Sequence, residues 1–393
     1  MGTETAATAI AELSLINVSD PATHSDIIRK CQSIISTLQE PGAVVMETLA
    51  GVAKYPCLVA ISNLGIFEKL SLDGPLKADQ LAEKCGADRW LVVRLMRVAV
   101  AWEIVTEIAP EHYAPTATSR IFAVPAFAAG LRNCHFSSQV IESLPQYLEE
   151  TQYRNPTDET KSLFQYHFKT DLELFEWRSG NKAAMDDFNL FMTIQRTRGQ
   201  HWQETFNVGS RILDGVEIDT SLPLLVDIAG GFGQDLCLLK TKLAPGYNVT
   251  KGQLVLEDQD TVINNIPADM YDADFKYVAH NFFTLQPVKG ARIYSLKGVL
   301  HDWPDHKAVE ILRHTAKALT PGYSKVWILD GIIPDMGADK VMVGLDIGMM
   351  ALFGALERNK EQWTQLLAQA GLKITSVSTL PDGFGLIEAE LDA

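Results

Sequence analysis

The chain has 393 residues, of which 47% are hydrophobic and 21% are charged, so we expect a folded protein with a substantial core rather than a disordered chain. This length is typical of a protein with two domains. The formal net charge of −15 argues against a nucleic acid or an anionic membrane surface as the main partner, because phosphate binding needs clustered lysine and arginine. No uninterrupted apolar run is long enough to cross a membrane, so we expect no membrane span.

The N-terminal segment and the cysteines indicate a reducing compartment. Residues 1–24 are small and polar, and we expect a loose tail without the basic and apolar regions of a secretory signal. The cysteines are scattered, odd in number and never spaced as CxxC, which disfavours disulfide frameworks and zinc ribbons. We therefore expect a cytoplasmic protein and no metal site.

Residues 25–130 have a mostly helical pattern and form the first expected domain. Within it, the sequence on either side of Gly86 predicts two short helices, for which Asp79 and Asp88 are the candidate caps. Residues 105–113 then predict a short hairpin. Two helices followed by a hairpin are typical of a winged-helix-like domain.

Winged-helix shapes often bind DNA, so the second helix of this domain needs a separate interpretation. It carries Arg89, Arg94 and Arg97 among many apolar residues. A helix this apolar is more often buried than laid in a DNA groove, and a dimer interface is one place to bury it. We therefore expect a homodimer and no nucleic-acid partner.

The pattern changes twice after residue 130. Residues 131–208 predict further helices rich in aromatic side chains, which we expect to form a linker and part of a substrate pocket. In residues 209–393, short apolar, β-rich runs alternate with helical stretches, which predicts a parallel, doubly wound sheet with helices on both faces. The runs at 372–379 and 384–391 are expected to be the two last strands.

The sequence LVDIAGGFGQDL predicts a strand, a glycine turn and a helix, and it is the first candidate binding site. Gly230, Gly231 and Gly233 allow close approach of a ligand and positive φ angles. The spacing is not the dinucleotide fingerprint G-x-G-x-x-G. Asp227 and Asp235 would repel a pyrophosphate, but they suit a cofactor with an amino group and a positive sulfonium. The turn thus favours S-adenosylmethionine over NAD, with an ordinary tight turn as the alternative.

A second strand, LVLED, ends in acids where nucleotide-binding βαβ units place a carboxylate on the ribose. Asp258 is the preferred hydroxyl acceptor, and Glu257 is its rival. The letters LEDQD also resemble the D-x-D metal site of a sugar transferase. That reading is weaker, because a hard-metal site needs further oxygen ligands that the sequence does not supply.

The sequence LKGVLHDWPDH, residues 296–306, ends an apolar run with a His-Asp pair. Because ligands bind at the carboxyl ends of strands in open α/β sheets, we expect His301 to share a cleft with the glycine turn. Three interpretations are open. His301 and Asp302 cap a strand and a helix, or they ligate a metal with Asp305 and His306, or His301 is a general base for a substrate hydroxyl. In the third interpretation, Asp302 caps or supports rather than reacts.

Several blocks of the chain together resemble one enzyme family. LVDIAGGFGQD, LHDWPDHKAVEILRHTAKALTPG, ILDGIIPD and ALERNKEQWTQLLAQAGL are similar to segments of S-adenosylmethionine-dependent O-methyltransferases of the caffeate/hydroxyindole type, above all their fungal secondary-metabolite branch. The resemblance extends over nearly the whole chain after the tail, and LHDWPD is its most specific block. It implies an N-terminal winged-helix-like dimerisation domain and a C-terminal Rossmann-like α/β methyltransferase domain.

The resemblance also implies a reaction and its residues. His301 matches the general base of the family, and Asp330 and Glu357 match the two acids that bracket this base. A nearby carboxylate favours the imidazolium and fixes the ring tautomer. The implied reaction is methyl transfer to a hydroxyl of a small aromatic or polyketide-like metabolite, with positioning supplying much of the rate.

The motif and the resemblance together place eight residues at the cofactor: Asp227, Gly230, Gly231, Gly233, Asp258, Asn281, Phe282 and Lys297. Two positions depart from the family pattern. Ala229 stands where the family usually has the first of three glycines, and Asn281 stands where it usually has an acid. An amide still forms a hydrogen bond with an adenine edge, but it lacks the charge.

The resemblance implies that four apolar side chains line the substrate pocket: Met192, Met349, Met350 and Phe353. Plain core packing is the alternative for each of them.

A second chemistry is possible on the same scaffold. Some fungal relatives use the methyltransferase fold, with the cofactor bound, as pericyclases or dehydratases in pyridone-type pathways. His135, in the linker region, could supply the donor that polarises a carbonyl there, and its alternative is a satisfied interdomain histidine. The presence of His301 with its two acids favours methyl transfer, whereas the departures at Ala229 and Asn281 keep the pericyclase reading open.

Overall fold

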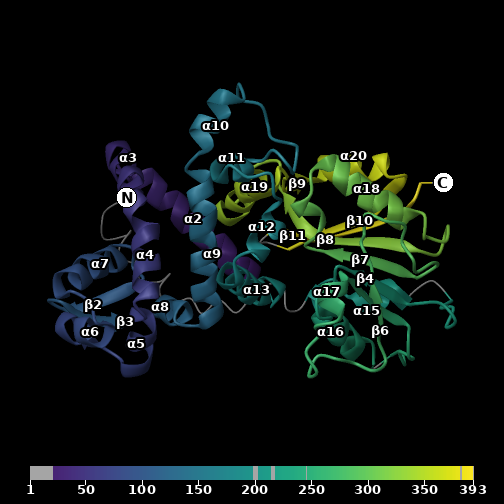
Figure 1. Ribbon diagram of the computed structural model, residues 1–393, viewed down its shortest axis with the longest axis horizontal. Helices are drawn as coiled ribbons and strands as arrows, with labels where there is room; N and C mark the ends of the chain where they lie inside the picture. The colour runs from purple at the N-terminus through teal and green to yellow at the C-terminus, as the bar shows by residue number, and fades with distance from the viewer. Residues whose placement is uncertain (1–20, 198–201, 214–216, 245, 381–382, 393) are drawn as a thin grey trace, which may run out of the picture. The chain divides into compact units, whose positions relative to one another are not determined.

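The computed structural model shows the chain as helices and strands over most of its length (Figure 1). It describes residues 21–197, 202–213, 217–244, 246–380 and 383–392. The expected tail lies outside the described residues up to position 20, and positions 21–24 belong to helix α2. By its contacts, the chain divides into two units, Met1–Cys57 and Leu58–Ala393.

The described part of the first unit is helical and exposes many apolar side chains. It contains α2 (Pro21–Leu38), α3 (Pro41–Ala50) and the short helix η1 (Gly51–Ala53). The most exposed apolar side chains are Leu38, Met46, Leu49 and Val52. No membrane span was expected, yet Pro41–Asn63 is long and apolar enough to cross one by length and composition. A single such stretch is weak evidence for a span, because helices of proteins without one pass the same test.

The next part of the chain combines four helices with a small sheet. The helices are α4 (Lys54–Asn63), α5 (Ile66–Asp73), α6 (Ala78–Cys85) and α7 (Arg89–Ala101). The strands are β1 (Leu76–Lys77), β2 (Val105–Ala109) and β3 (His112–Pro115), and they form an antiparallel sheet in the order β1-β3-β2. The predicted order of two helices and a hairpin is therefore confirmed.

The two helices around Gly86 are bounded almost as predicted. Gly86 ends α6 with φ of 63°, a left-handed conformation that suits glycine. Asp88 caps α7 by accepting a hydrogen bond from the Leu91 N–H at 2.9 Å. The prediction for Asp79 is wrong, because this residue lies inside the first turn of α6 and pairs with Arg89. Helix α7 buries its apolar face in the core of this unit.

A helical region follows, as expected for residues 131–208. Its helices are α8 (Ala117–Phe122), α9 (Pro125–Ile141), α10 (Leu144–Glu150), α11 (Leu163–Phe168), α12 (Leu174–Ser179), α13 (Lys182–Thr197), α14 (Trp202–Thr205) and α15 (Val208–Leu213). Helix α9 runs without a break across position 130. It packs closely on α13 at Gly130, where an added Cβ would lie 2.5 Å from the ring of Phe191.

The C-terminal part is built around one eight-stranded sheet. Its strands are β4 (Leu225–Ile228), β5 (Leu254–Asp258), β6 (Lys276–Ala279), β7 (Ile293–Lys297), β8 (Lys325–Ile333), β9 (Arg358–Asn359), β10 (Leu372–Thr379) and β11 (Phe384–Leu391). The order is β10-β11-β8-β7-β4-β5-β6, and the short β9 pairs with β8.

Strands β4 to β8 run parallel, whereas β11 is antiparallel to β8 and β10 is antiparallel to β11. The expected parallel arrangement is therefore confirmed for β4 to β8, and no direction was predicted for the last two strands. Only a short connection separates β10 from β11, and so short a connection joins antiparallel strands. The expected positions of both strands are confirmed.

Helices cover both faces of this sheet (Figure 1). The remaining helices are α16 (Gln234–Leu243), α17 (Asp260–Ile263), η2 (Leu300–Asp302), α18 (Asp305–Ala316), α19 (Lys340–Phe353) and α20 (Lys360–Gln369). Helices α18 and α20 pack on one face of the sheet, and α15 and α16 pack on the other. Two apolar layers around central parallel strands confirm the Rossmann-like α/β class.

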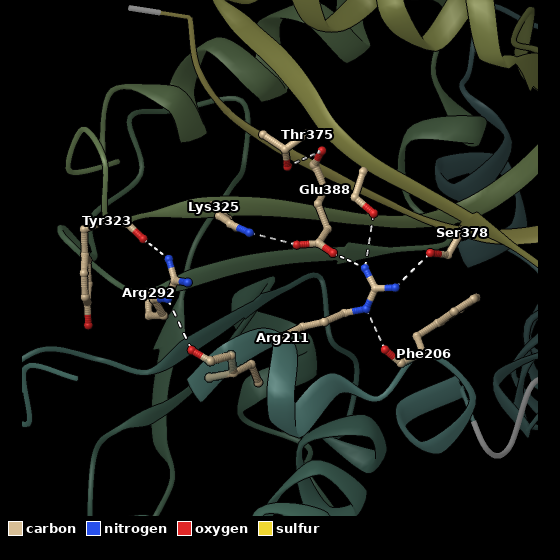
Figure 2. Close-up of polar contacts among 10 residues, drawn as sticks. Phe206, Arg211, Arg292, Tyr323, Lys325, Thr375, Ser378 and Glu388 are labelled. Carbon is tan, nitrogen blue, oxygen red and sulfur yellow. Dashed lines mark hydrogen bonds and ion pairs between the residues drawn. The ribbon is translucent and has the colours of Figure 1, made fainter. Parts of the chain in front are cut away.

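A buried polar network joins helix α15 to the antiparallel edge of the sheet (Figure 2). Glu388 of β11 is 3% exposed and pairs with Arg211 on one side and with Lys325 on the other. Arg211 also donates hydrogen bonds to the Ser378 hydroxyl and to the Phe206 carbonyl. This one carboxylate therefore holds the chain that precedes β4 against β10 and β11.

We expect Glu388→Gln to lower the free energy of unfolding by about 2–3 kcal/mol, because loss of a buried partner leaves two cations uncompensated and their partial exposure reduces the cost. The measurement is urea unfolding at neutral pH. The matched control is Glu390→Gln on the same strand, whose exposed pair with Lys373 should contribute less than about 1 kcal/mol. Equal effects of the two variants would contradict a structural role for the network.

Candidate active site

The glycine turn lies between β4 and α16, as predicted. Gly231 and Gly233 have φ of 62° and 86°, and Ala229 has φ of 58°. Glycine adopts these angles without strain, whereas a Cβ makes them unfavourable. Ala229, which departs from the family pattern, therefore has a left-handed backbone conformation, and its methyl group makes that conformation costly.

Gly230 contributes space rather than an unusual angle. An added Cβ at this position would lie 2.5 Å from Oδ2 of Asp227 and 2.6 Å from Cδ1 of Leu256. The Asp227 carboxylate is 4% exposed and lies directly against the turn. The structure thus brings Asp227 and the three predicted glycines together at the carboxyl end of β4.

The structure distinguishes between the two acids at the end of β5. Asp258 accepts hydrogen bonds from the N–H groups of Gly231 and Gln259, at 2.8 and 2.7 Å, so it faces the glycine turn. Each of its oxygens can accept a further bond. Glu257 is 1% exposed and contacts His280 and Gln286 instead. Asp258 is therefore the acid that borders the turn.

Lys297 lies at the end of β7 and contacts the helix that follows the turn. Its ammonium group is 2.9 Å from both carboxylate oxygens of Asp235. The indole N–H of Trp202 donates to the same carboxylate at 2.8 Å. The negative charge of Asp235 is thus largely compensated by Lys297. Asp235 would therefore repel a pyrophosphate less strongly than the sequence alone suggested.

The HNFF segment packs against the HDWPD segment. The side chain of Asn281 accepts a hydrogen bond from the N–H of Phe283 at 3.0 Å, so it stabilises its own turn. The ring of Phe282 lies edge-on to Trp303, with centroids 6.0 Å apart. The two segments, which are both predicted site elements, therefore meet through these aromatic rings.

His301 lies in the short helix η2, and two acidic side chains contact its ring. Its Nδ1 lies 2.6 Å from Oε1 of Glu357, and its Nε2 lies 3.6 Å from Oδ1 of Asp302. Asp330, on β8, is 2% exposed and is close enough to act on His301 electrostatically. The predicted cap at Asp302 is wrong, because no side chain caps α18 and Asp302 faces the histidine instead.

The alternative metal site does not form. Asp305 forms a hydrogen bond with the guanidinium of Arg358 at 2.9 Å, and His306 pairs with Glu159 at 3.3 Å. Both side chains therefore have partners other than His301 and Asp302. Within the described ranges, no group of three or more His, Cys, Asp or Glu side chains could hold a metal ion.

The charges around His301 change its proton affinity. Burial alone would lower the pKa of His301, but the carboxylates of Asp302, Asp330 and Glu357 outweigh it and raise that pKa to about 10. Burial raises the pKa of Asp330 to about 7 and also raises the pKa of Asp302. His301 is therefore a strong proton acceptor whenever it is neutral.

Arg358, which the sequence analysis did not single out, supports the turn that carries His301. It is fully buried and donates hydrogen bonds to the carbonyls of Leu300 and Trp303, at 2.9 and 2.8 Å. These carbonyls flank His301 in the chain. The only sign of this role in the sequence was that Arg358 follows Glu357 in the chain. Such a position does not reveal which way the Arg358 side chain points.

The predicted substrate residues lie on three helices, of which α9 packs on the other two. Helix α9 carries His135, α13 carries Met192, and α19 carries Met349, Met350 and Phe353. Helix α9 contacts both α13 and α19, and α19 also contacts the η2 turn that carries His301. Met349 is buried, whereas the other four are partly buried.

Comparison with known proteins identifies the family. The O-methyltransferase domain model matches residues 174–373, and the O-methyltransferase dimerisation domain model matches residues 46–125. The chain belongs to the O-methyltransferase family. It is an enzyme of the S-adenosylmethionine-dependent class, and the resemblance seen in the sequence is confirmed.

The chain is similar to full-length fungal members of this family. It is 34% identical to the O-methyltransferase penC of Penicillium thymicola, over 96% of this chain and 94% of that protein. The solved structure of a LepI variant in complex with SAH and a substrate analogue is 29% identical, with a TM-score of 0.88 and 99% of both chains covered. A structure described as a pericyclic reaction enzyme gives the same identity and TM-score, over 99% of this chain and all of that one.

The site fits S-adenosylmethionine. The positive φ angles of Gly231 and Gly233 shape the turn, and the carboxylates of Asp227 and Asp258 beside it suit ammonium and hydroxyl groups. The Pro41–Asn63 stretch falls largely within the match to the dimerisation domain.

We expect Ala229→Gly to raise the free energy of unfolding by roughly 0.5–1 kcal/mol, because removal of the Cβ relieves the left-handed strain by more than the added chain entropy costs. Thermal or urea unfolding measures this change. The control is Ala368→Gly at an exposed position of α20, which should destabilise the protein instead. Destabilisation by both substitutions would show that Ala229 is not strained.

We expect Glu357→Gln to lower the pKa of His301, because the substitution removes one of the negative charges that raise it. Titration of the imidazole by NMR should show His301 protonated up to about pH 10 in the wild type and losing its proton at lower pH in the variant. Glu361→Gln, an exposed change nearby in the chain, should leave the titration unmoved. An unchanged His301 pKa in Glu357→Gln would contradict the electrostatic account.

Proposed function

We propose that the protein methylates a hydroxyl group of a small aromatic or polyketide-like metabolite, with His301 as the general base. The contact between His301 Nδ1 and Glu357 carries this proposal. Because a carboxylate only accepts hydrogen bonds, Nδ1 keeps the proton and Nε2 presents its lone pair when the ring is neutral. Nε2 is then the atom that receives the substrate proton.

S-adenosylmethionine supplies an electrophilic methyl group in this chemistry. Neutral His301 removes the hydroxyl proton at Nε2, and the acids Asp302, Asp330 and Glu357 stabilise the imidazolium that results. Because the substrate oxygen gains negative charge as it loses the proton, it becomes a better nucleophile. Since the neutral fraction of His301 grows with pH, the rate should rise with pH up to the pKa of His301.

The proposed binding residues are those that the motif and the family resemblance indicate, and the contacts around the glycine turn support them. Asp258 and the glycine turn would hold the ribose, and Asp227 would attract the amino group. Asn281 and Phe282 would border the adenine, while Lys297 acts through Asp235. Met192, Met349, Met350 and Phe353 would line the substrate pocket on the packed helices.

A pericyclase or dehydratase activity is the second candidate. Its support is the likeness to LepI and to the pericyclic reaction enzyme, both at a TM-score of 0.88. His135 lies on α9, against the helices that carry the proposed substrate residues, and would polarise a carbonyl. The base His301 with its buried acids favours methyl transfer over a pericyclic rearrangement, which removes no proton.

The match to a dimerisation domain supports a homodimer. The five cysteines, which form no disulfide in the structure, support a cytoplasmic location. We also propose the domain limits 25–130, 131–208 and 209–393.

The proposed function is tested by incubating the protein with methyl-labelled S-adenosylmethionine and aromatic or polyketide-like candidate acceptors. Wild-type protein should yield a product with one labelled methyl group, detected by mass spectrometry. A rearranged or dehydrated product without label would favour the pericyclase instead.

We expect His301→Gln to slow label transfer by about 10²–10⁴-fold, the usual contribution of a general base. His306→Gln is the matched control, because this exposed histidine follows closely in the chain and pairs with Glu159 instead. It should retain wild-type activity. Undiminished transfer in His301→Gln would show that another group takes the proton.

A further inference from the structure

Arg178 of helix α12 is a buried cation outside the residues discussed so far. It is 2% exposed, and its Nε and Nη1 atoms are buried without a hydrogen-bond partner among the described residues. Its guanidinium carbon lies instead 4.5 and 4.9 Å from the ring centroids of Phe136 and Phe188. Two aromatic rings thus contact the charge, but no anionic side chain of the described residues does.

The other buried arginines of the described chain differ from Arg178. Arg292 donates hydrogen bonds to the carbonyls of Ile212 and Tyr323. Arg358 pairs with Asp305 and donates to two carbonyls. Buried guanidinium groups are thus paired elsewhere in this fold, which makes the unpaired Arg178 an exception.

Electrostatics lead to the same conclusion. Burial lowers the pKa of Arg178 to about 10, and no carboxylate in the described part of the chain counteracts this. The group is therefore still charged at neutral pH. An unpaired buried charge is costly, and an anion that enters from outside the chain would remove that cost.

The surroundings of Arg178 connect it to the proposed substrate pocket. Phe136 directly follows His135 in α9, and Phe188 lies one helical turn before Met192 in α13. Phe175 lies one helical turn before Arg178 in α12. Its ring is edge-on to Phe188 and tilted against Phe353, with centroids 5.5 and 5.6 Å apart. The residues around this cation are thus neighbours of the proposed substrate residues.

We infer that Arg178 binds an anionic group of the substrate, a carboxylate or a β-dicarbonyl enolate, while the surrounding aromatic rings contact the apolar body of the molecule. Both anions present two oxygens to the planar fork of the guanidinium, which can donate two parallel hydrogen bonds. This inference rests on the proposed function and narrows its substrate class to acidic aromatic or polyketide-like hydroxyl compounds.

The test compares small acids with their neutral amides. Binding of benzoate, benzamide, 4-hydroxybenzoate and 4-hydroxybenzamide is measured by calorimetry in saturating S-adenosylhomocysteine. The proteins are wild type, Arg178→Met and the exposed control Arg154→Met. We expect wild type and Arg154→Met to bind each acid roughly tenfold or more tightly than its amide, and Arg178→Met to lose this preference without weaker amide binding.

Three results would overturn the inference. The first is no preference for the acids in the wild type, and the second is a preference that survives in Arg178→Met. The third is a lower melting temperature of Arg178→Met with loss of amide binding, which would indicate a structural role. The expected melting temperature equals or exceeds that of the wild type, because methionine removes an unpaired charge. Since binding needs no methyl transfer, a preference for acids without label transfer would count only against the proposed function.

Discussion

The rest of the site depends on the hydrogen bond between His301 and the buried carboxylate of Glu357. It joins two residues that lie far apart in the chain, one in η2 and one directly before β9, across 2.6 Å. The bond orients the ring and fixes the tautomer, so that Nε2 is the atom left for a substrate. Arg358, next to Glu357, holds the carbonyls on both sides of His301, so the acid and the backbone support come from one short segment.

The parallel part of the sheet explains why the cofactor residues and the base lie near one another. Strands β4, β5 and β7 are neighbours, and the glycine turn, Asp258 and Lys297 stand at their carboxyl ends. In such sheets, ligands bind at this edge. The antiparallel strands β10 and β11 extend the sheet on the far side of β8, where Glu388 ties them to the chain that enters β4.

Much of this arrangement could be predicted from the sequence, because the strands, the glycine turn and the HDWPD block are local patterns. Asp88 was recognised as a cap for the same reason. The direction of the last strands was not recognised, since alternating apolar runs do not encode which way a strand runs. The roles of Asp302 and Arg178 depend on which side chains meet across the fold. For Asp302, sequence spacing suggested a helix cap, whereas the side chain contacts His301. For Arg178, the sequence gave no signal, because what distinguishes this residue is that two of its nitrogen atoms have no hydrogen-bond partner among the described residues.

The central claim is that His301 accepts the substrate proton, and chemical rescue tests it most directly. His301→Ala would be assayed for methyl transfer with added imidazoles of different pKa, at a fixed fraction of the neutral base. If His301 is the base, the restored rate should increase with the pKa of the added imidazole, as expected for proton transfer in the transition state. A rate that no imidazole restores, or that is restored independently of imidazole pKa, would contradict the account.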